Sequence, residues 1–269
     1  MHQQLLIQGE PLYYVEVGTG SPVVLLHGSL CDYRYWRWQL KSLSASHRVI
    51  VPSLPGYWPA LDLHNFKTSV QAERLQSLLD TLLGGGPYHL LGHSRGAQVA
   101  LQMALTRPRA LRSFILADPG YFYSLDRAEP ELFNQVLAQL EQGHTDEALA
   151  LFIDTVNGPS TWRQMVSWFK TMVRDNAPTL QRQAHDSAEL HLDIEQLTLP
   201  CPALLISGQY SPERYKRSIE SLKKQIPHAY EITISQAAHG MNLANPKAFN
   251  QSLLRFLAAT DLNRARTGQ

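Results

Sequence analysis

The sequence has only two cysteines, no long apolar run and almost no excess of charge, and each shortage argues against a class of protein. Cys31 and Cys201 cannot form a disulfide framework and lack the spacing of metal ligands, so we expect both to be small core residues. No apolar run approaches the roughly 18 residues that a membrane span needs. Residues 1–4 lack the basic start of a signal peptide. We therefore expect a cytoplasmic protein without a membrane partner.

The charges of the chain are nearly balanced. It has 24 Lys and Arg against 23 Asp and Glu, a net charge of +1, and contains no block of like charge. A nucleic-acid partner is therefore not expected, because such surfaces are basic. The 269 residues suffice for one large α/β domain or one domain with an inserted cap. We expect the partner to be a small-molecule substrate, and the sequence leaves the oligomeric state open.

Short apolar runs alternate with helical patterns, which predicts an α/β fold with a doubly wound, mostly parallel sheet. Weak alternation at residues 12–17 predicts an antiparallel strand leading into this sheet. Continuous apolar runs are typical of strands buried on both faces, and they occupy residues 22–26, 48–52, 88–91, 113–117, 202–207 and 230–234. Helices are predicted at residues 68–83, 97–105 and 246–260, the last followed by a polar tail that we expect to be frayed.

The strand pattern disappears between residues 121 and 199. Helical patterns replace it at residues 129–142, 146–156, 162–174 and 178–188. Ligands of doubly wound sheets bind at the carboxyl ends of the strands, and a helical insertion directly after a strand is placed to cover them. The sequence therefore predicts a core domain of residues 1–120 and 200–269, with a helical lid or cap of residues 121–199 inserted after the strand that ends at Asp118.

The segment Gly92-His93-Ser94-Arg95-Gly96 lies between a predicted strand and an Ala-rich predicted helix. A G-x-S-x-G in this position predicts a nucleophile elbow, a turn so sharp that only small flanking residues avoid clashes. Ser94 would then stand at the carboxyl end of a strand, beside the positive end of a helix. The pentapeptide alone occurs by chance in many proteins, but its position makes Ser94 the candidate nucleophile.

Serine at its ordinary pKa is a poor nucleophile and needs a base that a third group orients. The candidate base is His239, because it follows the last predicted strand in a loop that can lean over the top of the sheet. Of the other histidines, His93 lies inside the elbow and is expected to pack beneath the turn. His27 ends a strand and is expected to shape the neighbouring loop.

The acid that orients the base is harder to assign. The chain order places it before His239, yet the loop of residues 208–212 carries Ser211 where an aspartate is usual. Asp118 ends the neighbouring strand and is the preferred acid, although a turn aspartate before a proline is common. Glu213 is the alternative, and we expect it in the first turn of a helix.

An oxyanion hole needs two backbone N–H groups directed at the developing negative charge. One candidate is the N–H of Arg95, at the start of the helix after the elbow. The other comes from the loop after the strand of residues 22–26, from Ser29 or Leu30. The side chain of Arg95 is expected to face solvent or to bind the lid.

Taken together, these motifs resemble the α/β-hydrolase fold, in its branch of esterases, lactonases and C–C hydrolases. The loop His27-Gly28-Ser29-Leu30 followed by Trp36 is similar to the oxyanion loop of that family, residues 92–96 to its elbow and residues 239–240 to its base loop. The resemblance implies that Ser94 is the nucleophile, His239 the base and the backbone of Ser29 and Arg95 the oxyanion hole. Some relatives take the acid from the preceding strand end, which favours Asp118.

The resemblance also limits the reactions that the chain is expected to catalyse. Haloalkane dehalogenases and epoxide hydrolases have an aspartate at the nucleophile position, where this chain has Ser94. We therefore expect a serine hydrolase that cleaves a small to medium carboxylic ester or lactone through an acyl-enzyme, without metal or organic cofactor. The alternatives are a C–C bond hydrolase or cofactor-free dioxygenase, and a non-catalytic receptor. Two or three lid aromatics should line the substrate pocket, from the candidates Tyr121, Phe122, Tyr123, Phe152, Trp162, Trp168 and Phe169.

Overall fold

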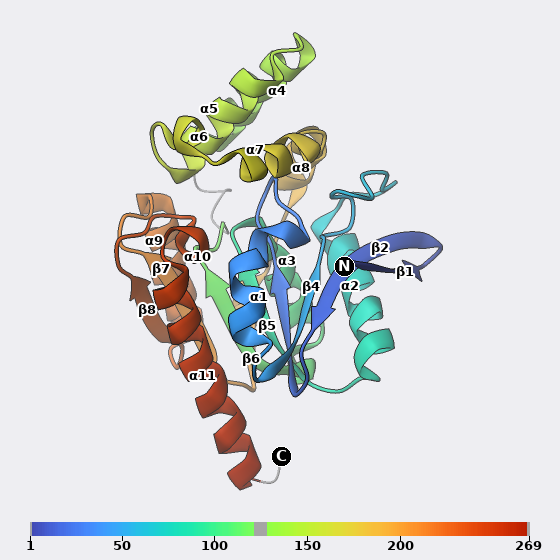
Figure 1. Cartoon of the computed structure of the whole chain (residues 1–269), viewed down its shortest axis with the longest axis vertical. Helices are drawn as coiled ribbons and strands as arrows, with labels where there is room; N and C mark the ends of the chain where they lie inside the picture. The colour runs from blue at the N-terminus through green and yellow to red at the C-terminus, as the bar shows by residue number, and fades with distance from the viewer. Residues whose placement is uncertain (1, 121–127, 268–269) are drawn as a thin grey trace.

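A computed structural model describes residues 2–120 and 128–267 of the chain (Figure 1). In this part of the chain an eight-stranded sheet has the order β1-β2-β4-β3-β5-β6-β7-β8. Strands β1 and β2 pair antiparallel, as do β2 and β4, whereas all other neighbours are parallel. The bounds are β1 Gln3–Ile7, β2 Glu10–Val17, β3 Ser21–Leu26, β4 His47–Pro52, β5 Tyr88–His93, β6 Leu111–Ala117, β7 Ala203–Gly208 and β8 Tyr230–Ile234. The predicted doubly wound, mostly parallel sheet is confirmed.

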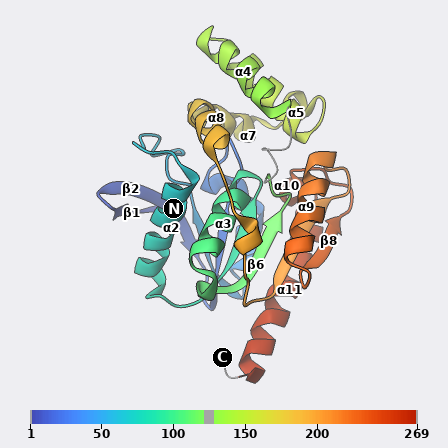
Figure 2. The same ribbon diagram turned by 180° about the vertical axis from the view of Figure 1, so that it is seen from behind.

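Helices cover both faces of this sheet, and the strands show why. Alternate side chains of β3 point to opposite faces, so Val23 and Leu25 join one apolar core while Val24 and Leu26 join the other. Figure 1 shows α1 and α11 over one face, and Figure 2 shows α2 and α3 over the opposite one. The bounds are α1 Arg37–Leu43, α2 Thr68–Leu83, α3 Arg95–Thr106, α9 Glu213–Gln225, α10 Met241–Ala244 and α11 Pro246–Thr267. Both cysteines are buried, as expected.

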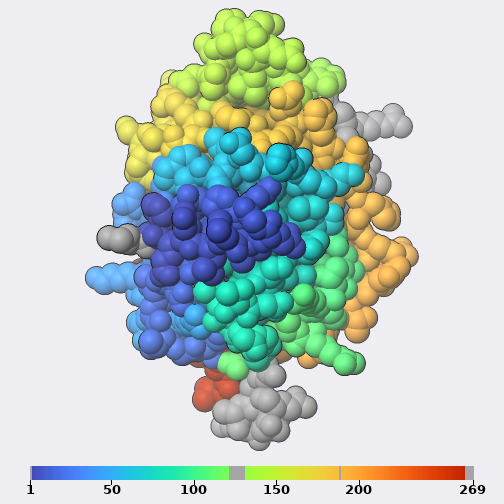
Figure 3. All heavy atoms as spheres, turned by 90° about the vertical axis from the view of Figure 1, so that its right-hand side faces the viewer, coloured from blue at the N-terminus to red at the C-terminus, as the bar shows by residue number. Residues whose placement is uncertain are grey.

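Five helices, α4 to α8, lie beyond the carboxyl ends of the parallel strands (Figure 1), and we call them the helical lid. The residues that form them make up the upper part of the molecule in Figure 3. Their bounds are α4 Ala128–Glu141, α5 Thr145–Asn157, α6 Thr161–Gln164, α7 Ser167–Asp175 and α8 Thr179–Glu189. They share an apolar cluster that includes Phe133, Phe152 and Leu180. Leu30, from the loop after β3, inserts into the same cluster. The lid helices therefore pack directly on a loop that borders the predicted site.

Three details differ from the sequence prediction. The predicted helix of residues 162–174 is two helices, α6 and α7, because Met165 and Val166 are extended, with ψ of 134° and 152°. The break keeps Trp162 against the lid cluster and lets Trp168 pack on the core beneath α1 and α11. Helix α11 runs to Thr267 rather than fraying after residue 260. The edge strand β1 has no counterpart in the prediction, since its side chains are mostly exposed.

A buried ion pair joins the lid to the core. The guanidinium of Arg95 on α3 lies 2.7 Å from the carboxylate of Asp186 on α8, and the two side chains are 1% and 5% exposed. Asp186 also accepts hydrogen bonds from the backbone N–H and the hydroxyl of Thr68, at 2.8 and 2.7 Å. Nη1 of Arg95 donates to the side-chain oxygen of Gln98, and Nη2 donates to that of Gln71. The Arg95 side chain is therefore bound to the lid, one of the two placements expected from the sequence.

Replacing Asp186→Asn leaves the buried guanidinium of Arg95 without its counter-charge. We expect the free energy of unfolding to fall by about 3–5 kcal/mol, the cost of breaking a buried pair from one side. Urea unfolding measures this change in free energy, with Asp146→Asn as the matched control. Asp146 pairs with Arg174 on the surface, both about half exposed, so its loss should cost about 0–1 kcal/mol. Equal losses in the two variants would contradict this account.

Candidate active site

Ser94 occupies a strained turn between β5 and α3. Its φ is 52° and its ψ is −116°, a conformation that an L-residue rarely adopts and that costs about 1–3 kcal/mol. A Cβ on Gly92 would lie 2.5 Å from the carbonyl oxygen of Gly96, and a Cβ on Gly96 would lie 2.5 Å from that of Leu26. Both glycines are therefore required by close backbone approaches. The turn has the strand–turn–helix geometry that the sequence predicts for an elbow at Ser94.

The structure brings Asp118 to His239. Nδ1 of His239 lies 3.2 Å from Oδ2 of Asp118, and the side chains are 5% and 0% exposed. Asp118 follows β6, and His239 follows β8. Ser94 and His239 both line one cavity at this end of the sheet. The three residues that the sequence analysis selected thus come from three strand ends and meet at one place.

The alternative acid, Glu213, lies elsewhere. It is in the first turn of α9, as expected, but it is 65% exposed and its closest ionic partner is Arg217. Ser211, which occupies the loop where an acid is usual, donates its hydroxyl proton to Oδ2 of Asp118. The N–H of Gly208 donates in turn to the Ser211 oxygen, at 3.0 Å. Ser211 is thus a partner of the acid, a role that the sequence analysis did not foresee.

Burial shifts the pKa values of the pair in opposite directions. It lowers the pKa of His239 to about 3, so the ring is neutral at pH 7 and free to accept a proton. It raises the pKa of Asp118 to about 7, while the hydrogen bond from Ser211 acts to lower it. Ser211 therefore helps to keep Asp118 charged near neutral pH.

A tyrosine stacks on the candidate base. The rings of Tyr215 and His239 are 3.9 Å apart between centroids and only 10° from parallel. Tyr215 lies on α9 and is 1% exposed. The stack restricts the plane of the imidazole, and the face of an electron-rich ring favours a positive charge beside it. Nothing in the sequence distinguishes Tyr215 from an ordinary core residue.

Two further histidines fix the surrounding loops. Nε2 of His93 lies 2.8 Å from the carbonyl oxygen of His239, and a carbonyl only accepts, so His93 donates this bond. The N–H of Leu54 donates to Nε2 of His27 at 2.9 Å, which places the His27 proton on Nδ1, facing the Gly28 carbonyl. Burial lowers the pKa of His27 to about 4. Both rings hold neighbouring loops in place, in line with the expectations for them.

The candidate oxyanion donors lie around the same cavity. Ser29 lines the cavity, and Arg95 directly follows Ser94 at the start of α3. Within the described residues, the N–H groups of Ser29 and Arg95 have no hydrogen-bond partner. Leu30 has a φ of 60°, and its side chain points away into the lid cluster. The left-handed conformation of Leu30 turns the loop sharply after Ser29.

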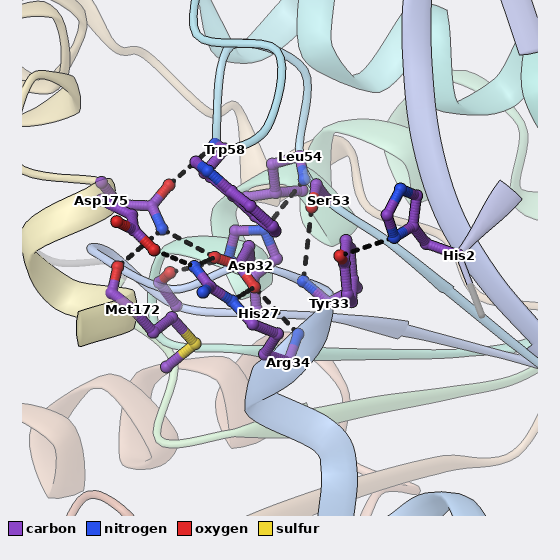
Figure 4. Close-up of polar contacts among 12 residues, drawn as sticks. His2, His27, Asp32, Tyr33, Arg34, Ser53, Leu54, Trp58, Met172 and Asp175 are labelled. Carbon is purple, nitrogen blue, oxygen red and sulfur yellow. Dashed lines mark hydrogen bonds and ion pairs between the residues drawn. The ribbon is translucent and has the colours of Figure 1, made fainter. Parts of the chain in front are cut away.

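Polar and charged side chains connect the loop after β3 to the lid (Figure 4). Asp32 is fully buried and accepts bonds from Nε of Arg34 at 2.8 Å and from the amide of Asn176 at 2.8 Å. Arg34 also pairs with Asp175 at 2.8 Å, and the N–H of Trp58 donates to the Asn176 oxygen at 2.9 Å. Asp175 and Asn176 end the lid helix α7. The loop after β3, the loop after β4 and the lid are therefore held as one unit.

The cavity above Ser94 has an empty volume of about 480 Å³, part of which is open to solvent. Of the predicted wall aromatics, Phe152 and Phe169 line it. Trp162 and Trp168 are not among the described lining residues: Trp162 packs under Lys170 and Arg174, and Trp168 under Arg37. The break between α6 and α7 directs these two rings away. Tyr121, Phe122 and Tyr123 lie outside the described residues.

No Lys, Arg, Asp or Glu is among the lining residues that the structure describes, which are Gly28, Ser29, Cys31, Tyr35, His93, Ser94, Phe152, Ile153, Val156, Asn157, Phe169, His239 and Gly240.

Comparison with known proteins gives the class of this fold and site. The model of the Alpha/beta hydrolase family matches residues 23–252, so the chain belongs to this family and is a hydrolase by homology. It is 26% identical over 260 residues to (E)-2-((N-methylformamido)methylene)succinate hydrolase of Acinetobacter baylyi, with 92% of this chain and 94% of that protein covered.

One further curated relative and one solved structure are similar to the chain. The chain is 27% identical over 250 residues to pimeloyl-[acyl-carrier protein] methyl ester esterase of Aeromonas salmonicida, with 89% of this chain and 96% of that protein covered. A thermophilic esterase from Thermogutta terrifontis has the same fold, with a TM-score of 0.82, 22% identity, and coverage of 97% of this chain and 99% of that one. Among the described residues, no helix is long and apolar enough to cross a membrane.

Removing the Ser211 hydroxyl should raise the pKa of Asp118, because the charged carboxylate loses a hydrogen-bond donor. In Ser211→Ala the carboxylate should therefore protonate at a higher pH than in the wild type. A ¹³C NMR titration of the Asp118 carboxyl carbon, assigned with Asp118→Asn, measures this. Ser207→Ala on the adjoining strand is the control, since Ser207 contacts Thr233 instead. An unchanged titration in Ser211→Ala would show that the hydroxyl does not stabilise the charge.

Proposed function

We propose that this protein is a serine hydrolase that cleaves a small to medium, uncharged carboxylic ester or lactone through an acyl-enzyme. The observation that carries the proposal is the convergence of Ser94, in its strained turn, with a neutral His239 whose Nδ1 faces Asp118. A positioned nucleophile, a base and an orienting acid are the parts that acyl transfer requires.

The residues support a definite sequence of steps. Ser94 Oγ attacks the carbonyl carbon while Nε2 of His239 takes its proton, since Nδ1 faces Asp118. The resulting imidazolium lies between the carboxylate of Asp118 and the ring of Tyr215. The N–H groups of Ser29 and Arg95 stabilise the alkoxide. His239 then protonates the leaving alcohol, and a water that it deprotonates releases the acid from Ser94.

The cavity suggests the class of substrate. Its lid side is formed by Phe152, Ile153, Val156 and Phe169, with Asn157 as a single polar group. No cationic side chain among the described lining residues is available to pair with a carboxylate. A neutral, mainly apolar acyl or alcohol group fits this wall best. That one relative is named as a methyl ester esterase is consistent with this proposal.

The proposal predicts hydrolysis of p-nitrophenyl butyrate by the wild type and its loss in Ser94→Ala. Mass spectrometry should locate a fluorophosphonate adduct on Ser94, because among the described serines it is the one that lies at a strand–helix turn in the cavity that His239 also lines. Ser207→Ala, which alters a hydroxyl on β7, should keep full activity and labelling.

Labelling at another serine in a protein that hydrolyses esters would refute the assignment of Ser94. A panel of esters, lactones and diketones separates the alternatives. Turnover of diketones alone would favour a C–C hydrolase, and tight binding without turnover of any of them would favour a receptor.

A further inference from the structure

A second cluster of side chains that can bind metal ions lies at the opposite end of the sheet. His47 is the first residue of β4, His89 is the second residue of β5, and Asp261 lies on α11. The five residues from His89 to Ser94 span roughly 16 Å of extended strand. The cluster is therefore separate from the catalytic cavity and has no part in the chemistry proposed above.

The two imidazoles direct the same ring atom at one carboxylate. Nε2 of His89 lies 3.2 Å from Oδ1 of Asp261, and Nε2 of His47 lies 3.6 Å from Oδ2. One ligand atom from each of the three residues lies within 4.8 Å of the others. The separation at His47 is longer than a hydrogen bond. Donors around a tetrahedral zinc ion are about 3.3 Å apart, given bonds of about 2.0–2.1 Å, so the separation between Nε2 of His47 and Oδ2 of Asp261 is close to that spacing.

The other nitrogen of each ring has a hydroxyl partner. Nδ1 of His47 lies 2.8 Å from the hydroxyl of Ser46, and Nδ1 of His89 lies 2.7 Å from that of Ser113. Metal-bound histidines commonly have such a partner, which fixes the ring and leaves the second nitrogen for the ion.

We propose that His47, His89 and Asp261 form a zinc-binding site that fastens the C-terminal helix α11 to strands β4 and β5. Two imidazoles and one carboxylate are ligands that suit zinc better than magnesium or calcium. The Asp261 side chain is 28% exposed, whereas the histidines are 5% and 0% exposed. Solvent therefore reaches the cluster on the Asp261 side, from which a water would supply the fourth ligand.

The positive charge of Arg112 lies beside Asp261 and acts against cation binding, which offers a second test of the proposal. Its guanidinium lies 3.0 Å from Oδ1 of Asp261 and also contacts the Ser21 hydroxyl. Oδ2 is therefore the oxygen that faces the ion in this proposal, while Oδ1 keeps its contact with Arg112, and Nε2 of His89 exchanges its contact with Oδ1 for the ion. The positive charge of Arg112 must nevertheless weaken cation binding. Removing it should tighten binding, the opposite of what removing Asp261 should do.

Zinc affinity is measured by calorimetry, with zinc chloride titrated into the metal-free full-length protein. The melting temperature is measured with and without zinc. The wild type should bind one zinc ion per chain and melt a few degrees higher with zinc. Asp261→Asn should weaken binding by at least about 100-fold, as expected for loss of a ligand. Arg112→Gln should tighten it. Asp146→Asn, which also removes the acidic partner of an arginine, should match the wild type.

Crystals of the wild type soaked in zinc, measured at the zinc absorption edge, locate the ion even if a variant fails to fold. An anomalous peak among His47, His89 and Asp261 supports the proposal. A peak only at His239 or elsewhere, no saturable binding, or equal affinity in wild type and Asp261→Asn would overturn it. Ester hydrolysis by Ser94 is independent of every one of these outcomes.

Discussion

The buried contact between Asp118 and His239 is the constraint on which the rest of this site depends. A carboxylate with no exposed surface is stable as a charge only if hydrogen-bond donors surround it. Here Ser211 donates to Asp118 from the loop after β7, and His239 faces it from the loop after β8. Each of these loops must therefore adopt one conformation. The stack of Tyr215 and the bond from His93 hold His239 from two other sides.

The lid is connected to this arrangement through polar contacts as well as apolar packing. Leu30 inserts from the loop after β3 into the lid cluster, and the amide of Asn176 donates to the buried Asp32 of the same loop. Asp186 of α8 binds the side chain of Arg95, whose backbone is a candidate oxyanion donor. A movement of the lid would therefore disturb the groups proposed to bind the substrate oxygen. The shape of the cavity and the positions of the proposed catalytic groups therefore depend on the same contacts.

Local sequence patterns were sufficient to predict most strands of the sheet, the sharp turn at Ser94 and the approach of Asp118 to His239. Strands buried on both faces are continuous apolar runs, and the carboxyl ends of parallel strands share one edge. Residues that follow different strands, such as Asp118 and His239, can therefore be placed together without knowing any side-chain contact. The proton-donating role of Ser211 could not be predicted, because it depends on the conformation of one loop. The Arg95–Asp186 pair joins segments far apart in the chain, and Tyr215 resembles any buried aromatic.

The helical lid was predicted less well for a related reason. Periodicity indicated helices, but the extended residues Met165 and Val166 break the third of them and redirect Trp162 and Trp168. Neither glycine nor proline marks this break. Tertiary packing determines it, since α6 stays with the lid cluster while α7 contacts the core. Wall residues of a pocket built on such helices cannot be selected from spacing alone.

The turnover number for p-nitrophenyl butyrate at pH 8, compared between Asp118→Asn and Glu213→Gln, tests the central claim most directly. Asp118→Asn keeps the shape of the acid but removes the charge that orients Nδ1–H of His239, so kcat should fall by up to about 10⁴-fold. Glu213→Gln alters only an exposed side chain and should stay within about 2-fold of the wild type. Circular dichroism must show both variants equally folded. A kcat near the wild-type value in Asp118→Asn, or a collapse in Glu213→Gln, would contradict this account of the site.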